Sequence, residues 1–394
     1  MANSFRVSAH TRTMDPAAPG PMTATESIVA HNRGRDPALL ALKWEKMRAS
    51  VFGFFRGTAH LFYANWAELS PGGSPRAWIC GDAHPENLGS YRGGNHVPYF
   101  DLNDFDECCL APVDWELGRA LAALHVLKRP DMARLFLRAY AAALGGGKPG
   151  NIEPEVAQGP AAKLLDKVQR RSRKEFLAKW VASGRLRIRP GHSFALEGAV
   201  KARVRRTIES WARRQPDPGL YRVLDVCGRI AGNGSLGLER YIVLVSGGKL
   251  PFILDMKAAA PAAPLSFFRA GQPGWPSEAE RVATVQHFMQ YVPIARLSWI
   301  GTAPVSYIVH GLQPAEDRIA VADLSEAENE EFVRQWAGLV ASAHLRCGGW
   351  RGSAGLDELI GFGRSLDGAA QRRLLAAARE AAAEQRRAWS EFRK

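Results

Sequence analysis

The chain has 394 residues, of which 46% are hydrophobic and 23% are charged. This balance excludes a disordered or low-complexity protein, and the length favours two lobes or domains over one compact core. Lys and Arg number 52 against 39 Asp and Glu, which leaves a net charge of +13. Such an excess is typical both of nucleic-acid-binding proteins and of enzymes that act on anionic substrates.

The cysteines and the apolar segments indicate the setting of the protein. Five cysteines are present, an odd number, and no CxxC motif occurs, so we expect neither a disulfide framework nor a cysteine-based zinc site. The first residues contain no apolar leader, and no run reaches the roughly 18 apolar residues that a spanning helix needs. We therefore expect a cytoplasmic protein without a membrane segment.

Helices are predicted at both ends of the chain and strands between them. From Pro37 the pattern LLALKWEKM and then FFRGTAHLFYANWAEL is helical, and two strands follow at RAWICGD and HVPYFDLNDFDE. A helix is predicted over PVDWELGRALAALHVLKR, followed by basic helical stretches. Residues 225–259 read as a three-stranded antiparallel meander, followed by the helix SEAERVATVQHFMQYV and the strand APVSYIVHGL. The remainder, from about residue 325, is helical.

These elements divide the chain into four segments. Residues 1–38 read as a flexible arm, residues 39–215 as the first part of a helical lobe, residues 216–312 as a sheet-rich lobe, and residues 313–394 as the second part of the helical lobe.

The chemistry that is easiest to recognise lies at two successive strand ends. Asp82 and Asn87 are five residues apart in a loop after a strand, and Asp101 follows fourteen residues after Asn87. Phosphoryl transfer uses a carboxylate near the attacking hydroxyl, together with an amide oxygen and a second carboxylate that hold magnesium. Each residue alone is more typical of a turn or cap, but the set favours a functional interpretation. Metal-assisted hydrolysis is the alternative, with a binuclear ligand set of His84, Asp101, Asp104 and Asp106.

A glycine-rich loop between two strands is the second candidate feature. Glycines let backbone amides approach phosphate oxygens, although many such hairpins are plain turns. The residues that we expect to bind a cofactor here are Gly232, Asn233, Gly234, Ser235 and Gly237. Lys257 follows on an apolar strand, where it either faces solvent or binds nucleotide phosphates as the strand lysine of protein kinases does. Glu278 and Glu280 of the next helix are candidate ion-pair partners for it.

These motifs resemble those of a known group of enzymes. ICGDAHPENL resembles the catalytic loop of aminoglycoside phosphotransferases and other kinase-like enzymes, and VPYFDLNDFDE is similar to their magnesium-binding segment. APVDWELGRAL resembles the helix start in which an Asp, here Asp114, braces the catalytic loop, and LVASAHLRCGG resembles the helix that leads into that loop. Because the glycine loop and its lysine follow the catalytic loop here, the resemblance implies an α+β, bilobal, protein-kinase-like fold that is circularly permuted.

The same permuted arrangement resembles the bacterial DUF2252 family of unknown function. The resemblance rests on FGFFRGTAHLF, GDAH, NDFDE, GNGSLG and the helix that contains Gln286 and Gln290, and the chain departs from it at Thr284, where a glutamate is expected. It implies Asp82 as catalytic base, Asn87 and Asp101 as magnesium ligands with Asp104 sharing or replacing Asp101, and ATP bound by the glycine loop and Lys257, with a hinge near Tyr307–Gly311. Substrate or structural support is assigned to Arg56, His84, Asp106, Glu107 and Asp114.

The resulting expectation is an ATP- and Mg²⁺-dependent phosphotransferase that acts on a hydroxyl of a small molecule or protein, and the net charge would suit an anionic acceptor. One alternative is a nucleotide-binding pseudokinase with a regulatory role. Another is a basic nucleic-acid-binding protein, suggested by QRRSRKEF and KARVRRTIESWARR, although these runs fit solvated helix faces better. The permutation itself predicts that Lys257 faces Asp101 across a cleft.

Overall fold

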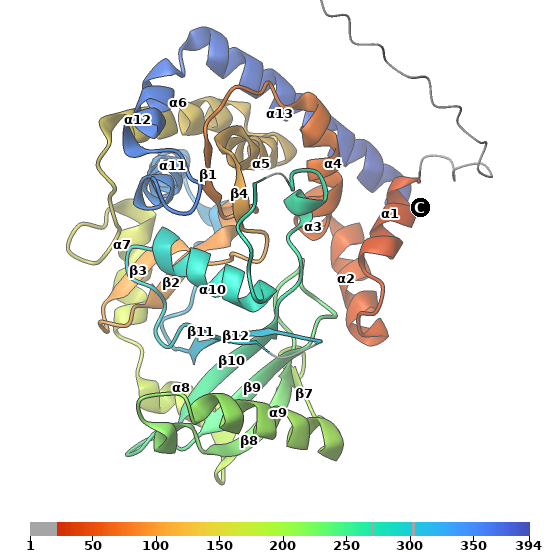
Figure 1. Cartoon of the computed structure of the whole chain (residues 1–394), viewed down its shortest axis with the longest axis vertical. Helices are drawn as coiled ribbons and strands as arrows, with labels where there is room; N and C mark the ends of the chain where they lie inside the picture. The colour runs from red at the N-terminus through yellow and green to blue at the C-terminus, as the bar shows by residue number, and fades with distance from the viewer. Residues whose placement is uncertain (1–21, 270, 302–303) are drawn as a thin grey trace, which may run out of the picture.

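The computed structural model describes residues 22–269, 271–301 and 304–394, which Figure 1 draws as a ribbon. The first 21 residues, part of the predicted arm, lie outside the described residues. The fold is mixed α+β, as predicted. Figure 1 shows most of the helices gathered at one end of the molecule and the large sheet at the other.

The helical end combines early and late parts of the chain. Its helices are α2 Pro37–Ala49, α3 Val51–Gly57, α4 Ala59–Leu69, α5 Val113–Val126, α6 Pro130–Gly146, α7 Gly159–Gln169, α11 Glu326–Arg346, α12 Leu356–Ser365 and α13 Gly368–Phe392. α11 and α12 pack against α6, and α13 packs along α5 and α4. Phe62, Leu117, Trp336 and Ala378 all lie in the same buried core, so the late helices complete the core of the early ones.

Two short strand pairs carry the acidic motifs within this lobe. β1 Arg76–Ile79 pairs antiparallel with β4 Cys109–Pro112, and β2 Leu88–Arg92 pairs antiparallel with β3 Pro98–Leu102. The loop between β1 and β2 and the turn between β3 and β4 therefore lie next to each other. This is how the two predicted strand ends come together.

The large sheet is antiparallel, and its six strands among the described residues run in the order β11-β12-β10-β9-β8-β7. Their bounds are β7 Ser193–Phe194, β8 Val223–Arg229, β9 Arg240–Val245, β10 Phe252–Ala258, β11 Ser298–Ile300 and β12 Tyr307–Leu312. The predicted meander is confirmed as β8, β9 and β10. A separate small pair, β5 Val181–Ala182 and β6 Arg185–Leu186, lies beside it.

Two helices cover opposite faces of the sheet. Trp211 of α9 (Gly198–Ala212) packs with Val243, whereas Trp180 of α8 (Arg173–Trp180) packs with Ile242. Neighbouring residues of a strand point to opposite faces, so β9 has a covered residue on each side. β7 is a strand of this sheet, and α8 and α9 pack against it. The sheet-rich part of the chain therefore begins before the predicted boundary at residue 216.

The segment predicted as an arm contains helical structure. α1 Ala24–His31 begins with a capping box between Thr23 and Glu26, and it contacts α13 and α4.

α10 Glu278–Met289 is capped by Ser277 and joins the two ends of the molecule. Val285 and Met289 lie in the helical core, and the helix also contacts β11 and β12. No helix in the described ranges is long and apolar enough to cross a membrane.

Candidate functional site

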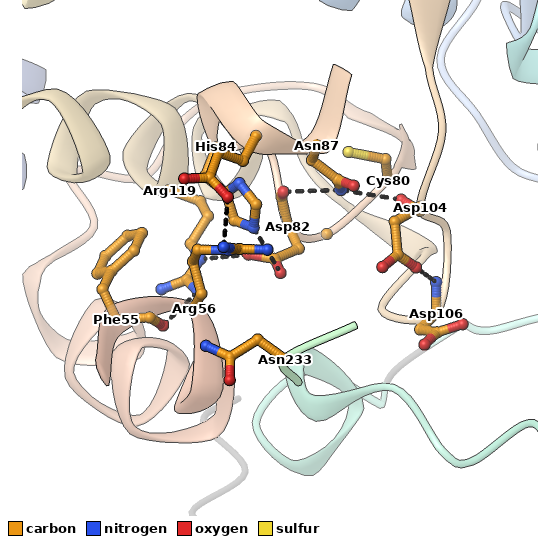
Figure 2. A network of polar contacts seen from close by, with 12 residues as sticks. Phe55, Arg56, Cys80, Asp82, His84, Asn87, Asp104, Asp106, Arg119 and Asn233 are labelled. Carbon is orange, nitrogen blue, oxygen red and sulfur yellow. Dashed lines mark hydrogen bonds and ion pairs between the residues drawn. The ribbon is translucent and has the colours of Figure 1, made fainter. Parts of the chain in front are cut away.

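Asp82 lies in the loop that leaves β1, and its carboxylate is held by two side chains. Arg119 Nε donates to Asp82 Oδ1 at 2.9 Å, and His84 Nε2 lies 3.4 Å from Asp82 Oδ2. Figure 2 shows both partners directed at the carboxylate. Burial alone would raise the pKa of Asp82, but Arg119 and His84 outweigh it and hold the pKa below its ordinary value. Asp82 is therefore an ionised acceptor at neutral pH.

His84 is a neutral imidazole beside this carboxylate. Burial lowers its pKa more than the neighbouring Asp82 raises it, and its Nδ1 has no hydrogen-bond partner among the described residues. The predicted supporting role of His84 is compatible with this contact. The same side chain packs edge-on against Phe52 of α3.

Arg119 was not among the residues predicted from the sequence. It is fully buried on α5, donates to the carbonyl of Phe55 at 2.7 Å, and places its guanidinium 3.6 Å from the centre of the Phe55 ring. A charged residue within the otherwise apolar stretch 117–124 of α5 is the signal that marks it in the sequence, because such a residue is rarely buried without a partner.

The carboxylate that braces the catalytic loop is Glu116. It accepts hydrogen bonds from the backbone amides of Cys80 and Gly81, the latter at 3.2 Å, and is fully buried. The prediction that Asp114 does this is wrong. Asp114 accepts instead from the hydroxyls of Ser70 and Ser74, so it fixes the connection between α4 and β1. The two acids are two positions apart on α5 and therefore point in different directions.

Asn87 joins the predicted catalytic loop, between β1 and β2, to the turn between β3 and β4 (residues 103–108), called the acidic turn below. Its side-chain amide nitrogen donates to the backbone carbonyls of Asp82 and Asp104, each at 3.0 Å. Figure 2 shows the amide between these two segments. Both donor hydrogens are thereby used by the protein, and the amide oxygen remains as an acceptor.

Lys257 of β10 reaches the acidic turn. Its Nζ forms an ion pair with Asp106 and lies 3.6 Å from Asp104 Oδ1. Burial lowers the pKa of Lys257, but Asp104 and Asp106 more than compensate and raise it overall, so the lysine is protonated. Burial and the neighbouring Asp104 raise the pKa of Asp106, whereas Lys257 brings that of Asp104 below its ordinary value.

A cavity of about 350 Å³ opens at this contact. Residues from both ends of the molecule line it, among them Asp104, Gly232, Lys257, Gln286 and Arg318. The predicted partners of Lys257 on α10 do not approach it. Glu278 pairs with Arg281 at 2.7 Å, and Glu280 lines a separate hollow beside Trp211.

A buried ion cluster supports the sheet side of the cavity. The fully buried Asp255 of β10 pairs with Arg229 of β8 and Arg240 of β9, and His310 Nε2 of β12 lies 3.4 Å away. Burial would raise the pKa of Asp255, but the two arginines keep it well below its ordinary value. Both arginines also line the cavity, together with Lys257 and Arg318, whereas Asp104, Asp106, Glu316 and Asp317 are the acids of the lining. This cluster was not predicted from the sequence.

The glycine loop contacts the N-terminal helices. The carbonyl of Gly234 accepts from Arg35 at 2.7 Å and from Lys43 at 2.8 Å, and Asn233 donates to the carbonyl of Gly53 at 2.8 Å. Gly232 has a φ of +81° and a Cβ there would lie 2.8 Å from the Ser235 hydroxyl oxygen, so glycine suits this turn. Gly237, with a φ of +90°, ends the loop. Of these loop residues, Gly232 lines the cavity.

Asp101 does not lie in the cavity. It is buried on β3, where it accepts from the backbone amides of Leu102 at 2.8 Å and Tyr291 at 3.3 Å and lies 3.5 Å from Arg346. The expectation that it holds magnesium and faces Lys257 is therefore corrected. The residues that meet Lys257 are Asp104 and Asp106, a few positions further along the same turn.

The remaining predicted residues form contacts within the protein. Arg56 of α3 pairs with Glu86 of the catalytic loop, which matches a structural role for it. Glu107 accepts from the backbone amide of Ala263, and burial raises its pKa to about 7. Glu107 thus links the acidic turn to the segment that follows β10.

The oxygen atoms of Asp104 and Asn87 suit a hard cation only when a bound substrate supplies further oxygen atoms. Within the described ranges, no three His, Cys, Asp or Glu side chains are grouped as a metal site, which gives no support to the binuclear alternative. Asp104 and the oxygen of Asn87 are oxygen donors of the kind Mg²⁺ prefers, and Mg²⁺ is commonly held by one or two carboxylates together with substrate phosphates. The described residues fit this arrangement, in which carboxylates hold Mg²⁺ together with substrate phosphates.

Comparison with known proteins identifies the family of the chain. The model of a family described as uncharacterized proteins conserved in bacteria (DUF2252) matches residues 35–394. Neither the curated proteins nor the solved structures contain a match to the chain. The matched range includes the catalytic loop, the acidic turn, the glycine loop and Lys257.

Proposed function

The chain belongs to the uncharacterized bacterial DUF2252 family, and from this starting point we propose that it is an ATP- and Mg²⁺-dependent phosphotransferase with a permuted kinase-like arrangement. The observation that carries the proposal is the meeting of Lys257 with Asp104 and Asp106 at one cavity. A lysine on the third strand of a meander whose first hairpin is glycine-rich, opposite an acidic turn, is the arrangement with which protein kinases hold nucleotide phosphates.

Four cations in the cavity lining support a polyphosphate ligand. They are Lys257, Arg229, Arg240 and Arg318, and the first three are held in place by carboxylates that are part of the protein. Arginine and lysine held in this way form charge-assisted hydrogen bonds to phosphate oxygens. On binding, the phosphates would compete with Asp104 and Asp106 for Lys257.

Asp104 and the amide oxygen of Asn87 would hold Mg²⁺ together with the nucleotide phosphates. The cation supplies neutralisation of the charge that develops on the transferred phosphoryl group. The donor hydrogens of Asn87 are bound to the carbonyls of Asp82 and Asp104, so the orientation of its oxygen is fixed.

Asp82 is the proposed base. Its ionised carboxylate accepts the proton of the acceptor hydroxyl while the hydroxyl oxygen forms a bond to the γ-phosphorus. The bond from that phosphorus to the bridging oxygen breaks, ADP leaves, and the proton passes from Asp82 to solvent. Arg119 and His84 keep the carboxylate ionised and orient it.

A pseudokinase is the second candidate, favoured by one observation. No acidic side chain of α10 pairs with Lys257 in the described ranges, and the α10 residues that line the cavity are Val282 and Gln286. A glutamate at this place is part of the active arrangement in protein kinases. In the present chain, Asp106 takes the position next to the lysine.

Two measurements test the proposal. Mg-ATP is expected to raise the Tm of the full chain, and Asp104→Asn is expected to abolish this shift while Asp101→Asn, as matched control, retains it. The absence of a shift in the wild type would refute both nucleotide-based functions. Turnover of ATP that is lost in Asp82→Asn with ATP binding retained supports the phosphotransferase, whereas ATP binding without turnover in the wild type supports the pseudokinase.

A further inference from the structure

A second and larger cavity lies outside the candidate site. Its volume is about 640 Å³, and it shares no lining residue with the cavity around Lys257. One wall comes from the β2–β3 hairpin and another from α8, β10 and the end of β12. The cavity therefore lies where the hairpin that follows the catalytic loop meets the sheet.

Four arginines surround this second cavity: Arg92, Arg171, Arg173 and Arg296. Among the described residues that line it there is no Asp or Glu. Arg171 pairs with Asp317, just outside the lining, but Arg92 and Arg173 donate only to backbone carbonyls. Arg92 donates to that of His96 at 2.9 Å, and Arg173 to those of Leu250 at 3.2 Å and Pro251 at 3.1 Å. Of these contacts, only the pair with Asp317 brings a carboxylate to an arginine of the lining.

The cavity lining also has an apolar part. Phe176 and Leu177 of α8, Phe252 of β10 and Leu312 of β12 belong to it. The guanidinium of Arg296 lies 4.0 Å from the centre of the Phe252 ring, so one arginine stacks on an aromatic residue of the same lining. Such a combination suits a ligand that has both a flat apolar part and an anionic group.

Two residues that line the cavity have a backbone conformation that residues other than glycine rarely adopt. His96 has a φ of +68° and Arg296 a φ of +65°, and they are two of five non-glycine residues with positive φ in the described part of the chain. This conformation persists where the surrounding structure enforces it, and it is concentrated at binding sites. Here it turns both side chains toward the same cavity.

We propose that this arginine-lined cavity binds a small amphipathic anion, an aromatic or aliphatic group bearing a phosphate or carboxylate. The apolar part would lie on Phe176 and Leu177, and the anionic group would be bound by Arg92, Arg173 and Arg296. The site does not depend on the function proposed for the cavity around Lys257.

The test uses 1-naphthyl phosphate as the probe, and its binding to the full chain is measured by isothermal titration calorimetry. The expected dissociation constant is at least about tenfold lower than that for 1-naphthol or for inorganic phosphate, because the apolar and the charged contacts are both needed. 1-Naphthaleneacetate, a carboxylate of similar shape, distinguishes the two kinds of anion. Equal affinity for naphthol and naphthyl phosphate would overturn the proposal, as would no measurable binding of either anion.

Substitutions locate the probe. Arg173→Gln and Arg296→Gln are each expected to weaken binding about tenfold, and Arg170→Gln is the matched control because its side chain is exposed and pairs with Asp166 on its own helix. Circular dichroism confirms that each variant is folded. Lys257→Met is expected to leave the affinity unchanged. Loss of binding in Lys257→Met, with the arginine variants unaffected, would place the probe in the other cavity and refute the proposal.

Discussion

The side chains of Asp82 and Arg119 lie 2.9 Å apart between the catalytic loop and the middle of α5. Arg119 is fully buried and also bound to the carbonyl of Phe55, so it connects α3, α5 and the loop in one contact. The orientation of the proposed base thus depends on helix packing as well as on its own loop.

Arg119→Met is expected to shift the acid limb of the kcat/KM profile to higher pH. Arg119 stabilises the ionised form of Asp82, so its removal raises the pKa of that carboxyl, and the base is lost at a higher pH. The measurement is the pH profile of ATP-dependent turnover. Arg119→Lys, which keeps the charge, serves as control, and an acid limb that is unchanged in Arg119→Met would contradict the assignment.

Asp101→Asn is expected to destabilise the protein without altering its response to Mg-ATP. The amides of Leu102 and Tyr291 donate to different carboxylate oxygens, so asparagine keeps an acceptor for only one of them and also removes the charge that faces Arg346. Loss of one partner of a buried ion pair costs about 3 kcal/mol in unfolding free energy. Urea denaturation measures this cost. A full loss of Mg-ATP stabilisation at unchanged urea midpoint would restore Asp101 as a metal ligand.

Glu107 is expected to make the folded state less stable as pH rises through the neutral range. Burial raises its pKa from 4.5 to about 7, so between these values the folded protein binds a proton that the unfolded chain has released. The associated stability is present at acidic pH and is lost as pH rises toward about 7. Denaturation at about pH 5 and about pH 8 should show a smaller difference in Glu107→Gln than in the wild type, by about 2 kcal/mol. An equal difference in both proteins would contradict the prediction.

Lys43→Met is expected to loosen the glycine loop. Lys43 is buried and donates to the carbonyl of Gly234 and, at 2.9 Å, to the side chain of Asn32. Methionine has a similar length but no donor, so residues 232–237 should exchange their amide hydrogens faster, and ATP affinity should fall about threefold to tenfold because the loop must be ordered on binding. Hydrogen exchange followed by mass spectrometry gives the first readout. Arg33→Met, at an exposed position nearby, should leave exchange unchanged.

The local motifs could be predicted from the sequence because their spacing is set by short segments. Asp82 and Asn87 lie in one loop, and β3 brings Asp104 beside them, so strand-and-turn patterns were sufficient. Lys257 was identifiable because the meander around it alternates apolar, strand-like runs with glycine turns. The ambiguity between Asp101 and Asp104 arose because three acids follow one strand closely, and only the packing of Arg346 and Tyr291 shows which one turns away.

Other features depend on contacts between distant segments, which spacing alone does not specify. Glu116, rather than Asp114, faces the catalytic loop because of the rotation of α5 in the core. The contacts of Arg35 and Lys43 with Gly234 join helices and a loop far apart in the chain. The membership of α8 and α9 in the sheet lobe follows from apolar faces on helices whose charged residues suggested a solvated surface.

The packing of α13 along α5 and α4 has a consequence for the order in which the protein matures. Thr58, at the start of α4, lies 3.2 Å from Gln385 of α13, and Ala378 and Ala381 complete the core beneath α5. A ribosome makes the catalytic loop early and α13 much later. The nascent chain therefore carries Asp82 on an incomplete support until α13 emerges, and the proposed activity would appear only after the helical lobe has closed.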